Sequence, residues 1–197
     1  EDIAARKRLI EWAGEFGFAT STDEIGNLYV RRAGVSSEEP PAVTGSHLDS
    51  QPKGGKFDGA YGVVGGFEAL EAIERAGIKT RRPIEVVAWS NEEGGRFQPG
   101  AMGSAIFAGD YLLEDALSAI DPNGVVLADA LKQTLESTPG IARRNMPYDM
   151  AGYVEAHIEQ GPRLENDNLT IGVVLGVQGL TWYRVEVFGE EAHAGTA

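Results

Sequence analysis

The run Ile84–Trp89 is the feature that most restricts the fold of this chain. It is a near-continuous series of apolar and β-branched residues, and it leads directly into the polar sequence Ser-Asn-Glu-Glu-Gly-Gly. A strand of this kind is typical of the interior of a parallel sheet, where helices cover both faces. The rest of the chain must therefore supply further strands beside it and helices that pack on it.

Hydrophobic periodicity along the chain indicates those elements. Strands are predicted over residues 26–32, 42–47 and 151–159, and helices over the first seventeen residues and over 60–76, 101–108 and 124–135. Alternation of strands and helices predicts an α/β fold with a mainly parallel sheet and helices on both faces. In such sheets the ligand site lies beyond the carboxyl ends of the strands.

The pattern changes near residue 177. Residues 181–188 alternate without a preceding helix, which predicts an antiparallel element of a second domain. We expect residues 1–176 to belong to a metal-binding catalytic domain and residues 177–197 to begin a lid or dimerisation domain. The chain does not open with Met and stops soon after this strand-like segment, so we expect it to be part of a longer polypeptide.

Composition narrows the classes of partner. Seventeen Lys and Arg stand against 30 Asp and Glu, a net charge of −13 that would repel nucleic acid. No apolar run is long enough to span a bilayer and the first residues do not form a signal peptide, so we expect no membrane partner and a cytoplasmic location. The chain has no cysteine, so nitrogen and oxygen atoms must hold any metal.

Four potential metal ligands occur in order along the chain, each at the end of a predicted strand or in the loop that follows one. They are His47, Asp58, Glu93 and His157. Imidazole nitrogen and carboxylate oxygen are the donors that hold a catalytic divalent ion. A single His or Asp near a strand end is more often a structural residue. Four of them in succession predict a metal site at one edge of the sheet.

The acidic residues in these segments are predicted to have different roles. Asp58 is a candidate to bridge two ions, and its alternative role is the N-cap of the helix that follows. Glu92 and Glu93 are adjacent, so their side chains diverge; one is predicted to bind metal and the other to act as general base, the alternative being a solvated acidic turn. Asp49 is predicted to accept the second ring proton of His47, or else to form a turn.

Five motifs carry a family resemblance. They are Thr-Gly-Ser-His-Leu-Asp-Ser, Gly-Gly-Lys-Phe-Asp-Gly-Ala-Tyr-Gly-Val, Asn-Glu-Glu-Gly-Gly-Arg-Phe, Glu-Ala-His-Ile-Glu-Gln-Gly-Pro and Ala-His-Ala-Gly-Thr. In this order the chain resembles the amidase, hydantoinase and carbamoylase branch of the M20 metallopeptidase family, from about Asp23 to its last residue. The resemblance implies two divalent ions of zinc, manganese, cobalt or nickel, and a homodimer in the full-length protein.

The resemblance also assigns roles to individual residues. It implies metal ligation by His47, Glu93 and His157, a bridging role for Asp58, and catalytic base function for Glu92. It places Gln160 against the bound substrate. It places His193 in the lid domain, which makes the dimer interface in this family, and gives it contact with the substrate, where it polarises the scissile carbonyl.

The expected activity follows from the same branch. Its members hydrolyse N-carbamoyl-L-amino acids, N-carbamoyl-β-alanine or allantoate, so we expect a metal-dependent hydrolase of linear amide or ureido C–N bonds, first an N-carbamoyl-L-amino acid hydrolase. The alternatives are an allantoate amidohydrolase or β-ureidopropionase, an M20 dipeptidase or aminoacylase, and a non-catalytic metal-binding fragment. The carboxylate-binding arginine and the final metal-binding histidine of relatives would lie after residue 197. We expect catalytic activity to depend on both residues.

Overall fold

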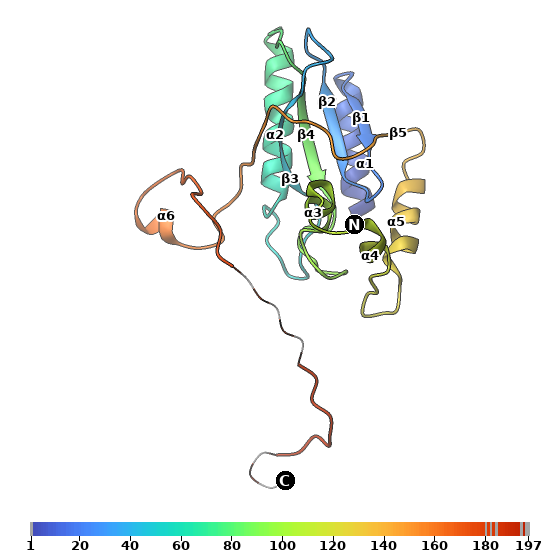
Figure 1. Cartoon of the computed structure of the whole chain (residues 1–197). Helices are drawn as coiled ribbons and strands as arrows, with labels where there is room; N and C mark the ends of the chain where they lie inside the picture. The colour runs from blue at the N-terminus through green and yellow to red at the C-terminus, as the bar shows by residue number, and fades with distance from the viewer. Residues whose placement is uncertain (1, 180, 182, 184, 194, 196–197) are drawn as a thin grey trace. The chain divides into compact units, whose positions relative to one another are not determined.

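One six-stranded mixed sheet organises the first part of the chain (Figure 1). The computed structural model describes residues 2–179, 181, 183, 185–193 and 195. The strands are β1 (Ala19–Thr22), β2 (Leu28–Arg32), β3 (Ala42–His47), β4 (Ile84–Trp89), β5 (Ala142–Arg143) and β6 (Gly152–Val154), in the order β5-β1-β2-β4-β3-β6. β2 is antiparallel to β1 and β4, whereas the other three pairs are parallel. The predicted mainly parallel sheet is confirmed.

The two central parallel strands end together. His47, the last residue of β3, pairs with Trp89, the last residue of β4, so the loops after both strands leave the same edge of the sheet. The strand predicted over residues 151–159 was too long. β6 ends at Val154, and residues beyond it turn toward the start of helix α2 (Ala60–Arg75), where a Cβ on Gly62 would overlap the carbonyl oxygen of Ala156. His157 therefore lies in a loop.

Helices α1 (Asp2–Glu15) and α2 cover one face of the sheet (Figure 1). Alternate residues of the strands point to that face, as the two-residue period of a strand requires. The resulting core contains Leu9 and Ala13 of α1, Val63, Phe67 and Leu70 of α2, and Leu28, Val30, Val86 and Ala88 of the strands. This packing encloses β2 and β4 on one side.

The opposite face of the sheet is covered by α3 (Met102–Ala108) and by residues 148–150. Tyr29, Val87 and Trp89 are buried there against Phe107 and Tyr148. α4 (Leu113–Leu117) and α5 (Leu127–Glu136) form a further apolar cluster with α3. Helices therefore lie on both faces, as predicted. The sequence did not indicate α4, β1 or β5, which are too short to show a clear period.

A buried carboxylate ties the segment after β5 to the middle of the sheet. Glu85 of β4 is fully buried and accepts hydrogen bonds from Arg31 at 2.6 Å, Arg144 at 3.0 Å and the hydroxyl of Tyr148 at 2.8 Å. A buried charge without such partners would cost several kcal/mol. The cluster therefore holds the chain across the sheet just before it enters β6 and the loop of His157.

The described residues form two compact units, Glu1–Ile158 and Glu159–Ala197. The second unit contains α6 (Arg163–Asn166), where the backbone N–H groups of Arg163 and Leu164 donate to the carboxylate of Glu159. Of the strand predicted over 181–188, residues 182 and 184 lie outside the described residues, and the described remainder has no strand pairing. The predicted domain boundary at residue 177 stays a prediction.

Candidate metal centre

His47 is the buried centre of the candidate site. It closes β3, and only 2% of its surface is exposed. Its Nδ1 lies 2.9 Å from the carbonyl oxygen of Asp49, an acceptor, so Nδ1 carries the proton and the lone pair of Nε2 faces the site. A Cβ on Gly59 would overlap the imidazole ring, so glycine at that position keeps the ring in place. His47 is thus oriented as a ligand through Nε2.

Asp58 lies between the two histidines. Its Oδ1 is 3.3 Å from Nε2 of His157 and 4.0 Å from Nε2 of His47, and the two imidazole rings have centroids 5.9 Å apart. His157 also has its Nδ1 2.9 Å from a carbonyl oxygen, that of Ile158, which leaves Nε2 toward Asp58. Gly59 takes the N-cap position of α2 without a side-chain hydrogen bond, so Asp58 is not the N-cap.

Glu92 and Glu93 reach the same site from the loop after β4. Oε2 of Glu92 lies 3.4 Å from Nε2 of His47. The carboxylate of Asp49 accepts the backbone N–H of Glu92 at 3.1 Å and that of Glu93 at 3.0 Å. The side chain of Asp49 is 3.8 Å from Nδ1 of His47, so its backbone carbonyl, and not the predicted carboxylate, bonds the ring. The carboxylate of Asp49 instead fixes the backbone of Glu92 and Glu93.

The donor atoms form two groups suited to a divalent ion. One is His47, Asp58 and His157; the other is His47, Glu92 and Glu93; within each, one donor atom per residue lies within 4.8 Å of the others. Oε1 of Glu93 is buried and has no hydrogen-bond partner among the described residues, a costly arrangement that a cation would relieve. The nitrogen and oxygen donors fit the chemistry of a catalytic divalent ion.

Glu92 carries a perturbed carboxyl group. Burial raises its pKa, and the negative charges of Glu93, Asp49 and Glu155 act in the same direction, whereas His47 acts in the opposite one. A carboxyl group with a raised pKa gains a proton more readily, as a general base must. A cation bound by the neighbouring donor atoms would lower the pKa of Glu92.

Sequence reasoning missed the residues that hold the loop of His157. Ser46 donates to Glu155 at 2.5 Å and Tyr153 donates to the other oxygen of Glu155 at 2.6 Å, while Trp89 donates to the Tyr153 hydroxyl at 3.0 Å. These bonds join β3, β4 and β6 at their carboxyl ends. The spacing of Glu155 two residues before His157 was the available signal.

Gln51 was also missed. Its Nε2 donates to the carbonyl oxygen of Glu93 at 2.7 Å, and lies 3.3 Å from Oε2 of the same residue. Gln51 and Asp49 belong to one loop after β3, so that loop orients the ligands that follow β4. Nothing in the periodicity of the sequence indicates this cross-loop contact.

Gln160 and His193, the two predicted substrate residues, belong to the second unit. Nδ1 of His193 accepts a hydrogen bond from the backbone N–H of Gly195 at 3.1 Å. Both residues are exposed within the described structure. Their roles toward substrate stay predictions.

Comparison with known proteins identifies the family of this chain. Residues 43–196 match the family described as Peptidase family M20/M25/M40. The chain is 43% identical over 197 residues to the N-carbamoyl-L-amino-acid amidohydrolase of Rhizobium meliloti, covering 99% of this chain and 46% of that protein. It is 38% identical over 191 residues to allantoate deiminase 2 of Glycine max, covering 94% and 39%. The chain belongs to the M20 family of metal-dependent hydrolases.

A solved structure gives the same result. A hydantoinase/carbamoylase family amidase from Burkholderia ambifaria superposes with a TM-score of 0.79 at 42% identity, over 85% of this chain and 40% of that one. The chain thus spans about half the length of the curated relatives it matches. A second solved structure, from Burkholderia multivorans, is likewise named an amidase of the hydantoinase/carbamoylase family, with a TM-score of 0.78 at 43% identity over 85% of this chain and 40% of that one.

Proposed function

We propose that these residues form the metal-binding part of a hydrolase of linear amide or ureido C–N bonds, and that N-carbamoyl-L-amino acids are its first substrate class. The observation that carries the proposal is the convergence of His47, Asp58, His157, Glu92 and Glu93 at one edge of the sheet. The names of the relatives support the substrate class. Allantoate is the second candidate, because deiminases of that substrate are also similar.

Two divalent ions are the proposed cofactor, with His47, His157 and Glu93 as ligands and Asp58 between the two ions. The position of Asp58 between the two imidazoles supports a bridging carboxylate. When bound, such ions activate water and polarise the carbonyl of the substrate. The donors suit zinc, manganese, cobalt and nickel alike, so the proposal extends to all four.

Glu92 is the proposed general base. It lies beside the ligands, its side chain is 39% exposed, and its backbone is fixed by Asp49. From this position its carboxylate accepts a proton from water and delivers it to the leaving nitrogen. Glu93 has a buried carboxylate oxygen without a hydrogen-bond partner among the described residues, which favours ligation for that neighbour.

Paired substitutions in the protein that carries these residues test this division. Glu92→Gln keeps the shape of the side chain but cannot accept the proton, so hydrolysis of an N-carbamoyl amino acid should fall about 10²- to 10⁴-fold with metal content unchanged. Glu93→Gln should instead lower the metal content. A Glu92→Gln protein with near-normal turnover would refute the assignment.

Two further assays decide between the alternatives. Ammonia release from carbamoyl substrates, compared with amino acid release from dipeptides, separates the proposed activity from that of a dipeptidase or aminoacylase. Metal analysis of the purified protein tests a non-catalytic fragment, for which hydrolysis would be absent at full metal content.

The family resemblance supports a homodimeric full-length protein, a substrate contact by Gln160, and polarisation of the substrate carbonyl by His193. The cytoplasmic location is proposed from the composition of the chain. The lack of cysteine is compatible with a reducing compartment. Across the described residues the structure has no helix that is long and apolar enough to cross a bilayer.

A further inference from the structure

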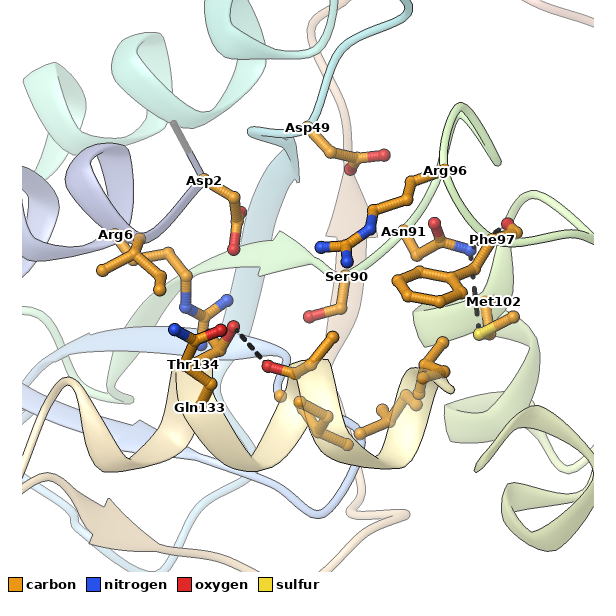
Figure 2. A pocket seen from close by; sticks show the side chains of 16 residues that line it. Asp2, Arg6, Asp49, Ser90, Asn91, Arg96, Phe97, Met102, Gln133 and Thr134 are labelled. Atoms are coloured by element: carbon orange, nitrogen blue, oxygen red, sulfur yellow. Dashed lines mark hydrogen bonds between the residues drawn. The ribbon is translucent and has the colours of Figure 1, made fainter. Parts of the chain in front are cut away.

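A cavity lies in the first unit, between α1, α5 and the loop that follows β4 (Figure 2). Its volume is about 250 Å³. Apart from Asp49 its walls contain none of the residues of the candidate metal centre. One wall is apolar and is made by Ile25, Phe97, Met102, Leu127 and Leu131. The other walls carry charged groups, and these groups decide what the cavity can hold.

Arg6 is the most unusual of those groups. It lies in α1, only 4% of its surface is exposed, and its Nε is fully buried without a hydrogen-bond partner among the described residues. Figure 2 shows its guanidinium among the pocket side chains, near Asp2 and near Gln133 and Thr134 of α5. Burial lowers the pKa of Arg6, while the negative charges of Asp2 and Asp23 oppose that effect. The buried Nε of Arg6 thus has no acceptor among the described residues, and an oxygen atom of a ligand in the cavity would supply one.

Arg96 supplies a second cation. Its Nε donates to Asp121 at 2.8 Å, which anchors the side chain and leaves its terminal nitrogens directed into the pocket (Figure 2). Two guanidinium groups therefore line the cavity, and a guanidinium suits a carboxylate because its planar fork matches the two oxygens. Asp2 and Asp49 also line the cavity and add negative charge on the same side. The cavity therefore combines cationic, anionic and apolar surfaces.

We propose that this cavity binds an aliphatic α-amino acid as its zwitterion. The carboxylate would lie against Arg6 and Arg96, the ammonium group against Asp2 and Asp49, and the side chain against the apolar wall. Pockets for drug-sized ligands span roughly 300 to 1,000 Å³, so a cavity slightly below that range fits an amino acid of the size of leucine. This proposal does not depend on the activity proposed above.

The cavity and the candidate metal centre are connected by residues that they share or that adjoin in sequence. Ser90 and Asn91 line the cavity and directly precede Glu92. Asp49 lines it as well, and its carboxylate holds the backbone of Glu92 and Glu93. A bound amino acid would contact the same short segment that positions these two glutamates.

Methyl NMR with leucine as the probe tests the site directly. EDTA is present throughout, so that the metal centre cannot hold the ligand through an ion. Leucine should shift the methyl signals of Ile25, Met102, Leu127 and Leu131. Leucinamide lacks the carboxylate and 4-methylpentanoate lacks the ammonium group, so each should bind at least about tenfold more weakly than leucine.

Two arginines of α1 provide a matched pair of variants. Arg6→Gln should weaken leucine binding by about tenfold or more. Arg8→Gln, in the same helix, removes an exposed guanidinium paired with Glu11 at 3.3 Å and should leave binding unchanged. Thermal unfolding checks that both variants fold. If Arg6→Gln does not fold, Leu131→Trp fills the apolar side of the cavity and should abolish binding instead.

Three results would overturn the proposal. The first is a set of methyl shifts that leucine causes elsewhere but not at the four pocket residues. The second is equal binding of leucine, leucinamide and 4-methylpentanoate. The third is unchanged affinity in a folded Arg6→Gln or Leu131→Trp protein.

Discussion

The two donor groups of the candidate centre share His47 but are held in different ways. Glu92 and Glu93 follow an interior strand, and the loop after the neighbouring strand fixes their backbone through Asp49. His157 follows the three-residue edge strand β6, and 30% of its side chain is exposed. Interior strands place ligands by sheet register, whereas the edge strand relies on side-chain hydrogen bonds such as those of Glu155.

Removal of each histidine should give the largest loss of metal. Each of the two rings has its Nδ1 at 2.9 Å from a backbone carbonyl oxygen, so Nε2 is the nitrogen that it offers to an ion. One lone pair binds one ion, so His47→Ala and His157→Ala should each retain about one of two ions. Metal analysis after dialysis measures the content, and unfolding curves confirm that both variants fold. Loss of both ions from either variant would show that the two histidines do not serve separate ions.

Substitution of Gly59 tests how strongly the backbone at that position fixes the ring of His47, which belongs to both donor groups. The φ of Gly59 is +63°, and a Cβ there would overlap the ring of His47. Gly59→Ala should cost about 1–3 kcal/mol in backbone strain alone, and more from the displaced imidazole. The free energy of unfolding in urea measures this, and metal affinity should fall with it.

Gly65 is the matched control for that change. It lies inside α2, and a Cβ there would meet nothing within 4 Å. Gly65→Ala should stabilise the protein by about 0.5–1 kcal/mol, because alanine loses less backbone entropy in a helix. A similar loss of stability in both variants would remove the specific role given to Gly59.

Substitution of Asp49 tests only the donor group that includes Glu92 and Glu93. Each carboxylate oxygen of Asp49 accepts one backbone N–H of the glutamate pair. Asp49→Asn leaves one of these donors facing an amide NH₂, so metal affinity should fall about 10- to 100-fold while the chain stays folded. Ser50→Ala, which removes only an exposed hydroxyl bonded to Gln51 at 3.3 Å, should leave affinity unchanged. Competition with a fluorescent chelator measures both variants.

The sequence predicted the interior of the site better than its edge. β4 coincides with the near-continuous apolar run Ile84–Trp89, and β3 has the predicted bounds, residues 42–47. β6 is short and exposed, so its apolar pattern did not reveal that it ends at Val154. The four predicted ligands and Glu92 converge, but the contacts of Asp49, Gln51 and Glu155 depend on how loops meet in space. Spacing along the chain places Glu155 near His157 and Asp49 near His47, but it does not specify these contacts.

The change in the free energy of unfolding at acidic pH is the smallest of the expected effects. Asp121 anchors Arg96, which follows Glu92 and Glu93 in the same loop. The Arg96 guanidinium, with the backbone N–H groups of Val125 and Asn123, holds the pKa of Asp121 below its ordinary value. The folded state thus favours the charged carboxylate. The stability it contributes is present above the pKa of the unfolded chain and is lost as pH falls through the lower pKa of the folded protein.

Asp121→Asn should therefore be less stable than the parent near neutral pH, and the difference should shrink toward zero in acid. Urea unfolding across a pH series measures it. Asp110→Asn, which alters an exposed carboxylate, should show no such convergence. A stability difference that is constant with pH would show that the ion pair with Arg96 does not stabilise this loop.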